Sequence, residues 1–415
     1  MGEAEYGYAN LTRAQLMDLA AYLVSLAPVS PPFDGGTTSD AGTPPVSTAV
    51  QCVSTGSSTF RTEVFASGLT SPWGMVFLPD QRLLVTQKAG SMVLMSADGG
   101  SRTPLSWSTP APQIISAGQG GLLDVALDPD FGTSPWVYFT YAEPGPSNSS
   151  GVAVGRASLQ GNALVNFQRL YQQTPKLSFS EIHFGSRLAF HPDRTLFVSL
   201  GDRSYDDPAR ATTTFAQNPA NSVGKIIRLN RDGTIPSNNP FQGQAGAVPE
   251  LWSLGHRNPQ GLTYDAVTAT LWSTEHGPQG GDEVNRILSG ANYAWPLRSY
   301  GCQYGVPQGT TCRFGGGAHL PLNGSTFNEP LTFWAPTSIA PSNVIVYRGS
   351  GFPAWNGHLF VGGLGGRLWR IELNNGVYAS CEALVLNERI RDVRQGPDGW
   401  IWVLTDSGSI RRVLR

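Results

Sequence analysis

Two turns bounded by glycine and proline carry the groups of this chain that are best suited to bind a ligand. They are residues 255–261, with the sequence GHRNPQG, and residues 275–283, with the sequence EHGPQGGDE. Each turn follows a short apolar segment typical of a strand, so its polar groups point out of a sheet and into a loop. Arg257 offers a planar fork of donors for an anion, and the carbonyls of Gly277 and Pro278 suit a hard cation. The turns predict a site for a small polyanion and a metal ion; the alternative is two ordinary turns with Arg257 in a salt bridge.

The composition excludes several classes of partner. The chain has 415 residues, enough for one large domain or two ordinary ones, and a formal net charge of −2. Only 14% of its residues are charged, so it has no basic face for nucleic acid or an anionic membrane. No apolar run reaches the roughly 18 residues of a membrane span. The high content of glycine (49), proline (31) and tryptophan (11) favours many short strands and turns over helices.

The cysteines indicate an oxidising compartment. They are Cys52, Cys302, Cys312 and Cys381, and none lies in a CxxC or CxxCH spacing, which excludes zinc-ribbon, thioredoxin and c-type haem sites. Cys302 and Cys312 bracket a glycine-rich loop, and we expect a local disulfide between them. Such a bond would place the protein outside the cytoplasm, either periplasmic or secreted. The first residues, MGEAE, are acidic and polar and form no signal peptide, so we expect that the natural N-terminus has been removed.

The first 27 residues differ from the remainder of the chain. Thr12 and Gln15 form a capping box, and the helix that they predict ends at Pro28. Its leucines recur at a spacing of three or four residues: Leu16, Leu19, Leu23 and Leu26. This segment resembles the last helix of a class I cytochrome c domain; the alternative is an amphipathic segment that packs on the main domain. Residues 28–58 are rich in Pro, Gly, Ser and Thr and are predicted to be a linker.

From about residue 62 onward a pattern of strand, Pro/Asp/Gly turn and second strand occurs six times. The six units lie at residues 73–86, 122–139, 187–199, 261–273, 343–361 and 393–404. Repeats of this kind, with loops of variable length between them, are typical of a β-propeller. A TIM barrel would need helices of 3.6-residue period between the strands, and none appear. We therefore predict an all-β fold, a six-bladed β-propeller over residues 59–415, with a short N-terminal helix at residues 1–27.

Polar residues fall at equivalent places in these units, either in the loop that enters a blade or in the loop after its second strand. The residues at these places are His183, Asp202, Arg257, Asn258, Gly277, Pro278, Arg389 and Arg391. Such loops meet at one end of the central channel of a propeller, so we expect these residues to line a single cavity.

Seven motifs, in this order along the chain, identify a family resemblance. They lie at residues 119–124, 183–188, 200–202, 224–233, 255–261, 275–283 and 389–392. The chain resembles the soluble, pyrroloquinoline-quinone-dependent glucose/sorbosone dehydrogenases, which are aldose sugar dehydrogenases. The resemblance covers nearly all of residues 62–415 and leaves out the helix and the linker. It implies a quinoprotein that oxidises the hemiacetal hydroxyl of an aldose to a lactone by hydride transfer to the quinone.

The resemblance also implies roles for individual residues. His183 would be the general base, Asp202 would orient it and contact the sugar, and Gln119 would contact the sugar. Arg257 would act at the reactive carbonyl of the quinone. The implied cofactor-binding residues are Arg257, Asn258, Trp334, Thr337, Arg367, Arg389 and Arg391. The carbonyls of Gly277 and Pro278 would bind calcium, which would polarise the quinone.

Three positions depart from the family pattern. Some members place a lysine against the quinone from the fifth blade, where this chain has residues 363–367, which makes Arg367 the candidate substitute. His276 stands in place of a glutamine, and Leu331 in place of a tyrosine near the sugar. The identity of the sugar therefore stays open.

Two other functions fit a six-bladed propeller. A calcium-dependent lactonase also holds a metal in the channel, but it uses carboxylate and asparagine ligands and does not need Arg257, Arg389 and Arg391 together. A non-catalytic propeller that binds a ligand or partner is the second alternative. For a dehydrogenase, the electron acceptor would be a cytochrome c domain, of which the N-terminal helix is the remnant, or a separate acceptor.

Overall fold

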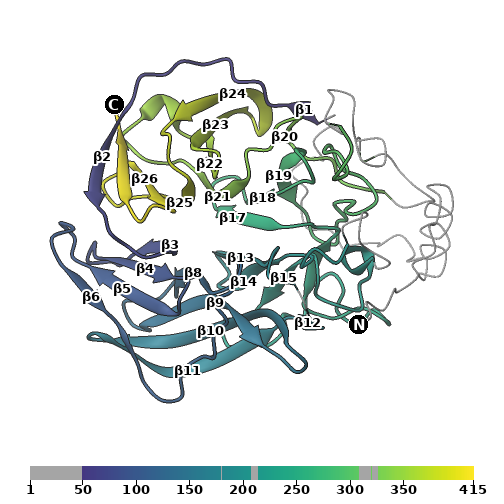
Figure 1. The fold of residues 1–415 in the computed structure, drawn as a ribbon, viewed down its shortest axis with the longest axis horizontal. Coiled ribbons are helices and arrows are strands. Elements are labelled where there is room, and N and C mark those ends of the chain that lie inside the picture. The colour runs from purple at the N-terminus through teal and green to yellow at the C-terminus, as the bar shows by residue number, and fades with distance from the viewer. Residues whose placement is uncertain (1–48, 179, 207–213, 308–318, 320–325) are drawn as a thin grey trace, which may run out of the picture.

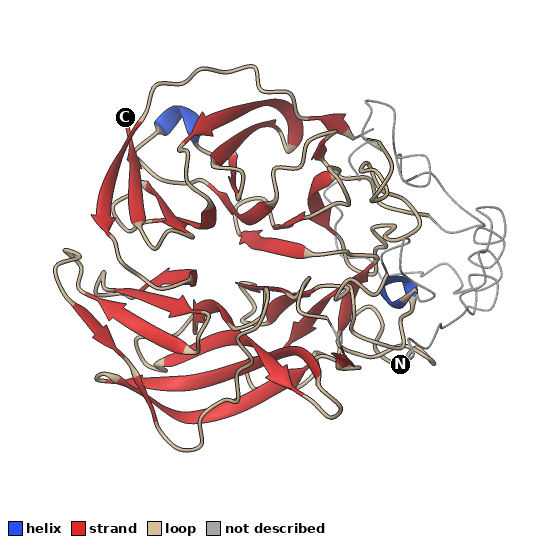
Figure 2. Cartoon of the chain, viewed as in Figure 1, coloured by secondary structure: helices blue, strands red, loops and turns tan. Residues whose placement is uncertain are grey.

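The computed structural model describes residues 49–178, 180–206, 214–307, 319 and 326–415. Within these ranges the chain forms six sheets arranged around a central axis, with strands predominating throughout (Figures 1 and 2). The predicted six-bladed β-propeller is confirmed. The helix predicted within residues 1–27 and most of the linker lie outside the described residues.

The first three blades follow the chain from the inner strand outward. Blade 1 consists of β3 (Pro72–Phe77), β4 (Leu83–Gln87), β5 (Ser91–Met95) and β6 (Arg102–Pro104). Blade 2 consists of β8 (Leu122–Leu127), β9 (Trp136–Pro144), β10 (Ser149–Gln160) and β11 (Ala163–Gln172), with β7 (Ser106–Trp107) on β11 and β12 (Leu177–Ser178) on β10. Blade 3 consists of β13 (Gly185–Phe190), β14 (Leu196–Leu200), β15 (Lys225–Leu229) and β16 (Leu251–Leu254).

The remaining blades complete the ring. Blade 4 consists of β17 (Pro259–Asp265), β18 (Thr270–Glu275), β19 (Asp282–Ile287) and β20 (Thr332–Trp334), with β1 (Val50–Gln51) at its outer edge. Blade 5 consists of β21 (Pro341–Val346), β22 (Leu359–Gly363), β23 (Arg367–Asn374) and β24 (Val377–Val385). Blade 6 consists of β25 (Ile390–Gln395), β26 (Ile401–Thr405), β27 (Ile410–Leu414) and, from the start of the domain, β2 (Arg61–Ala66). The antiparallel pairing of β2 with β27 closes the ring.

Aspartate side chains close the recurrent turn between the first and second strands of a blade. In blade 3, Asp193 Oδ1 accepts a hydrogen bond from the amide of Thr195 at 2.9 Å, and Arg194 between them has a φ of 72°. In blade 1, Asp80 Oδ1 accepts from the amide of Arg82 at 3.1 Å. A short aspartate side chain that satisfies a nearby amide stabilises such a turn locally, which is why the repeat is visible in the sequence.

The hydrophobic core lies between neighbouring blades. Between blades 1 and 2, for example, the fully buried side chains of Leu84, Val125 and Phe139 pack together. The first strand of each blade contacts the first strands of the two adjacent blades, so six strands surround the axis. Because both faces of each sheet are covered, the middle strands of a blade are buried along their whole length, as β14 and β15 of blade 3 are.

The end of the predicted linker forms a strap along the outside of the propeller. In this strap, residues 49–58, β1 pairs in parallel with β20, and Cys52 forms a disulfide with Cys381 of β24. The sequence did not indicate this pairing. The predicted partner of Cys302, Cys312, lies outside the described residues, so that second bond stays a prediction. The Cys52–Cys381 bond fits a protein from an oxidising compartment.

Helical structure within the described ranges is limited to two short 3-10 turns, η1 (Phe215–Gln217) and η2 (Pro353–Trp355) (Figure 2). Neither of these two turns is long and apolar enough to cross a membrane.

Candidate active site

Hydrogen bonds link the loops that carry six of the predicted site residues. These loops enter β13 and β17 and follow β14 and β18. His183 Nδ1 lies 2.7 Å from Asp202 Oδ1, and the amide of Asp202 donates to the carbonyl of Arg257 at 2.7 Å. Asn258 Oδ1 accepts from the amide of Gly185 at 3.1 Å. Arg257 in turn donates to the turn that contains Gly277 and Pro278. The fold thus brings together residues that are distant in sequence.

The His183–Asp202 pair is held in a defined orientation. The side chains are 8% and 0% exposed, respectively. Asp202 Oδ1 also accepts from the amide of Ser204 at 2.7 Å, and its Oδ2 accepts from Trp295 Nε1 at 2.8 Å. A carboxylate held in this way keeps the imidazole proton on Nδ1, which gives Nε2 the lone pair of a base.

Asp202 is an ionised carboxylate despite its burial. Burial alone would raise its pKa, but the charge and hydrogen bond of His183 and the charge of Arg257 outweigh it and lower the pKa below its ordinary value. A stable negative charge beside His183 favours the uptake of a proton by the imidazole.

The backbone around this pair adopts unusual conformations. Four non-glycine residues have a left-handed φ: His183 (53°), Ser186 (79°), Arg203 (56°) and Ser204 (59°). A Cβ at Gly201 would lie 2.0 Å from the carbonyl oxygen of His183, so only glycine fits there. Conformations of this kind cost about 1–3 kcal/mol each and concentrate at functional sites.

Arg257 and Asn258 present buried donors without a partner. Arg257 Nη1 donates to the carbonyls of His276 and Gly277, each at 3.1 Å, and its guanidinium lies 5.2 Å from the Trp295 ring. Arg257 Nε and Asn258 Nδ2, however, are buried and have no hydrogen-bond partner within the described structure. Buried donors are normally satisfied, so two such atoms on adjacent residues fit a ligand rich in acceptor atoms.

The Gly277–Pro278 turn offers backbone oxygens for a cation. Asp282 is occupied elsewhere, since it accepts from the amides of Gly277 at 3.0 Å, Ile339 at 2.7 Å and Ala340 at 2.9 Å. The described ranges contain no group of three or more His, Cys, Asp or Glu side chains that could hold a metal. The Gly277 carbonyl already accepts from Arg257, but a carbonyl oxygen has a second lone pair. The donor set therefore fits a hard cation whose remaining ligands come from a cofactor and solvent.

Arg389 and Arg391 share one carboxylate. Arg389 Nε lies 2.9 Å from Asp406 Oδ2, and Arg391 contacts both carboxylate oxygens at 2.8 and 3.0 Å. Arg391 Nη1 also donates to Gln260 Oε1 at 3.3 Å. Burial would raise the pKa of Asp406, but the hydrogen bonds from the two arginines lower it, so the carboxylate is charged.

Lys88 is a site residue that the sequence interpretation missed. Its Nζ donates to the carbonyl of Gly118 at 2.5 Å, next to Gln119. Burial and the charge of Arg391 lower the pKa of Lys88, whereas Asp406 raises it, so all three groups are neighbours. Arg389 and Arg391 thus bind one carboxylate, and Lys88 adds a further positive group in their vicinity. Lys88 and Asp406 directly follow the second strands β4 and β26, and this position was the signal that could have revealed them.

His276, which replaces the family glutamine, is a neutral imidazole. Its Nε2 lies 2.8 Å from the carbonyl oxygen of Pro341 and donates to it. Burial, Arg257 and His183 lower the pKa of His276 to about 3. His276 therefore adds no positive charge to this part of the site.

The other predicted residues differ in how closely they join this group. Gln119 is exposed, and its Oε1 accepts from the amide of His183 at 2.8 Å. Trp334 is 3% exposed, and its Nε1 is a further buried donor without a described partner. Thr337 and Arg367 are both exposed, and the contacts within the described part of the chain do not join them to the group.

Comparisons with known proteins identify relatives of this chain. Residues 69–413 match the model of the family described as Glucose / Sorbosone dehydrogenase. The chain is 37% identical to an aldose sugar dehydrogenase of Escherichia coli K12 over 360 residues, which cover 85% of this chain and 91% of the relative. The crystal structure of the soluble E. coli aldose sugar dehydrogenase in its apo form superposes with a TM-score of 0.76 at 35% identity, covering 86% and 99% of the two chains. A PQQ-bound aldose sugar dehydrogenase from Streptomyces coelicolor superposes with a TM-score of 0.66 at 26% identity, covering 86% and 98%.

Proposed function

The chain belongs to the glucose/sorbosone dehydrogenase family, and we propose that it oxidises the hemiacetal hydroxyl of an aldose to the lactone with pyrroloquinoline quinone and calcium. The observation that carries this proposal is the oriented His183–Asp202 pair beside the unpartnered donors of Arg257 and Asn258. The pair supplies a base, and the donors supply a place for an acceptor-rich cofactor.

His183 acts as the general base. The Nδ1–H of His183 donates a hydrogen bond to Asp202, so the Nε2 lone pair is the one that takes the proton of the anomeric hydroxyl. The negative charge of Asp202 stabilises the imidazolium that forms. The quinone, when bound, supplies the acceptor for the hydride that leaves the anomeric carbon. Gln119, whose side chain holds the backbone of His183, contacts the sugar from the loop before β8.

The charges of the site suit a quinone with three carboxylates. Arg257 Nε and Asn258 Nδ2 donate to the quinone oxygens, and Trp334 Nε1 is a further candidate donor. Lys88, Arg389 and Arg391 carry three positive charges and Asp406 carries one negative charge. The resulting excess of two positive charges attracts carboxylates. Arg367 and Thr337 are exposed cofactor-binding candidates. The carbonyls of Gly277 and Pro278 would hold calcium, which would polarise the quinone, and Arg257 would act at the same reactive carbonyl.

The test is a spectroscopic titration. Protein freed of metal is mixed with calcium chloride and pyrroloquinoline quinone, a panel of aldoses is added, and reduction of the bound quinone is followed by absorbance. We expect reduction that depends on both additions and produces the lactone. Hydrolysis of a lactone with calcium alone, with no quinone reduction by any aldose, would replace the proposal by the lactonase alternative.

Location and electron acceptor belong to the same proposal. The Cys52–Cys381 bond supports a periplasmic or secreted protein. The electrons pass either to a cytochrome c domain of the same protein or to a separate acceptor. A CxxCH motif encoded in frame upstream would favour the first, and its absence would favour the second.

A further inference from the structure

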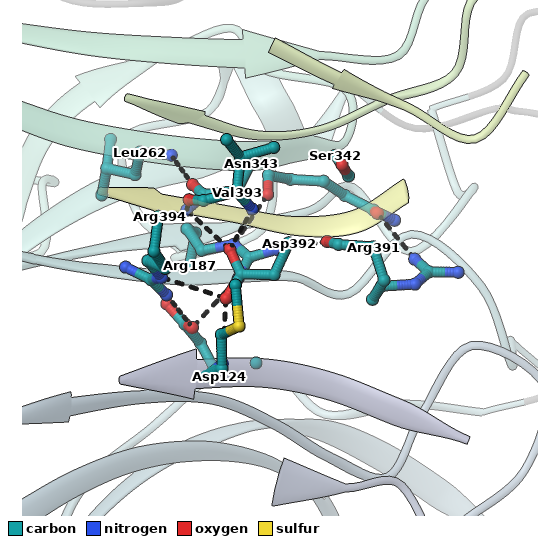
Figure 3. Close-up of polar contacts among 12 residues, drawn as sticks. Asp124, Arg187, Leu262, Ser342, Asn343, Arg391, Asp392, Val393 and Arg394 are labelled. Carbon is teal, nitrogen blue, oxygen red and sulfur yellow. Dashed lines mark hydrogen bonds and ion pairs between the residues drawn. The ribbon is translucent and has the colours of Figure 1, made fainter. Parts of the chain in front are cut away.

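A buried cluster of charged and polar side chains joins all six inner strands beside the proposed quinone site (Figure 3). Its members are Asp124 on β8, Arg187 on β13, Asn343 on β21, and Asp392 and Arg394 on β25. Blades 1 and 4 join it through the backbone: the amide of Met75 on β3 donates to Asp392 Oδ2 at 2.9 Å, and the amide of Leu262 on β17 donates to Asn343 Oδ1 at 3.4 Å. The cluster contains two arginines and two carboxylates, so its charges balance.

Arg187 is the centre of this cluster. Its side chain is fully buried, and its Nη1 lies 3.0 Å from Asp124 Oδ1 and 3.3 Å from Asp392 Oδ1. Its guanidinium stacks on the Trp73 ring at 4.1 Å. A guanidinium held by two carboxylates and a ring has almost no freedom to move.

The remaining donors of Arg187 hold the backbone of Gln260 and of Arg391, the second of which is a proposed cofactor residue. Nε donates to the carbonyl of Gln260 at 2.9 Å, and Nη2 donates to the carbonyl of Arg391 at 3.1 Å. The side chains of Gln260 and Arg391 contact each other at 3.3 Å. One buried cation therefore sets the relative position of two residues that come from blades 4 and 6.

We propose that Arg187 is a positioning residue, which holds the backbone of Gln260 and Arg391 so that the Arg391 guanidinium meets a carboxylate of the cofactor. This inference rests on the proposed function, because it assigns Arg391 to the quinone. Arg187 itself touches neither cofactor nor sugar; it acts through the two carbonyls.

Arg394 provides a matched control within the same cluster. Its Nη2 lies 2.8 Å from Asp124 Oδ1 and its Nε 3.0 Å from Asp392 Oδ2, so it shares both carboxylates with Arg187. It is not bonded to the Gln260 or Arg391 carbonyls in the described structure. Arg187→Lys and Arg394→Lys thus make the same chemical change on the same carboxylates, but only the first loses the backbone contacts.

The experiment measures the Kd of pyrroloquinoline quinone by calorimetric titration in saturating calcium, together with the Tm of each protein. Both lysine variants are expected to lower the Tm, because each weakens a buried ion pair. Arg187→Lys should raise the Kd about tenfold, as expected for a displaced charge-assisted contact, and Arg394→Lys less than about threefold. Equal Kd changes in the two folded variants would overturn the proposal.

Three further variants separate the possible failures. If Arg187 acts through Arg391, the double variant Arg187→Lys with Arg391→Ala binds the quinone no more weakly than Arg391→Ala alone; additive losses would overturn the positioning role. If Arg391→Ala alone leaves the Kd unchanged, the proposed cofactor role of Arg391 fails.

Should Arg187→Lys not fold, Trp73→Phe loosens the Arg187 guanidinium without a change of charge and should raise the Kd of the quinone about threefold. An unchanged Kd in folded Trp73→Phe would also overturn the inference.

Discussion

At the scale of single residues, the chain contains two histidine–aspartate pairs in blade 3 that differ in their surroundings. His183 and Asp202 are buried and lie at the end of the channel where the donors of Arg257 and Asn258 gather. His191 and Asp193 are 2.8 Å apart in the turn between β13 and β14, at the opposite ends of those strands, with side chains 28% and 41% exposed. The same chemical pair can serve as a base in one place and close a turn in the other.

His183→Ala should therefore lower aldose turnover by about 10²- to 10⁴-fold while the Kd of the quinone changes little, because the variant removes only the base. His191→Ala is the matched control and should keep full turnover. Single-turnover reduction of the bound quinone and a parallel binding titration give both quantities. Unchanged turnover in His183→Ala would remove His183 from the mechanism.

Lys88→Met tests the excess of positive charge near Asp406. Since a charge-assisted contact is worth about 1.5–3 kcal/mol, we expect the Kd of the quinone to rise about tenfold or more. The effect should shrink in high salt, which screens a half-buried cation. Lys176→Met, which removes a lysine paired with Glu143, serves as the control. A Kd that is insensitive to Lys88→Met at low salt would assign this lysine to holding the Gly118 loop alone.

At the scale of elements, the strap of residues 49–58 ties together outer strands of two blades. It pairs with β20 of blade 4 through β1, and the disulfide from Cys52 reaches β24 of blade 5. Ser58 Oγ adds a hydrogen bond to Glu382 of the same strand at 2.8 Å. The strap covers strand edges that would otherwise expose unpaired backbone groups.

Replacement of both Cys52 and Cys381 by serine should lower the free energy of unfolding by about 2–4 kcal/mol, because the bond restrains the unfolded chain. Guanidinium unfolding of the oxidised wild type and of the double variant measures this difference. Turnover at low temperature is expected to stay close to that of the wild type, since the disulfide joins the strap to β24, the outer strand of blade 5. Identical unfolding midpoints would mean that β1 holds the strap without the disulfide.

At the scale of the whole molecule, the first strands of six blades surround one axis, and the proposed site combines loops from several blades. The protein as a whole carries a net charge of −2, yet Arg389 and Arg391 bind one carboxylate with Lys88 in their vicinity. Local positive charge of this kind would steer the proposed anionic cofactor to the channel.

Calcium and the quinone are expected to bind interdependently, because the Gly277 and Pro278 carbonyls supply only part of a coordination shell. An excess of chelator should release the quinone, and calcium should restore binding, as followed by ultrafiltration and absorbance of the filtrate. A quinone that stays bound and reducible in excess chelator would contradict the calcium role.

What the sequence by itself determined is local. The Asp-closed turn at Asp193 and its counterparts are stabilised within a few residues, so their repetition revealed six blades and the loops that carry His183, Asp202, Arg257 and Asn258. Only the tertiary structure decided the pairing of Cys52 with Cys381, which are 329 residues apart, and the positions of Lys88 and Arg187. These contacts join different blades. The place of Lys88 directly after a second strand marks it in the sequence, but its neighbours, and those of Arg187, are set by closure of the ring. Short-range hydrogen bonds leave a repeated pattern along the chain, whereas contacts across the channel depend on which strands the closed ring brings together.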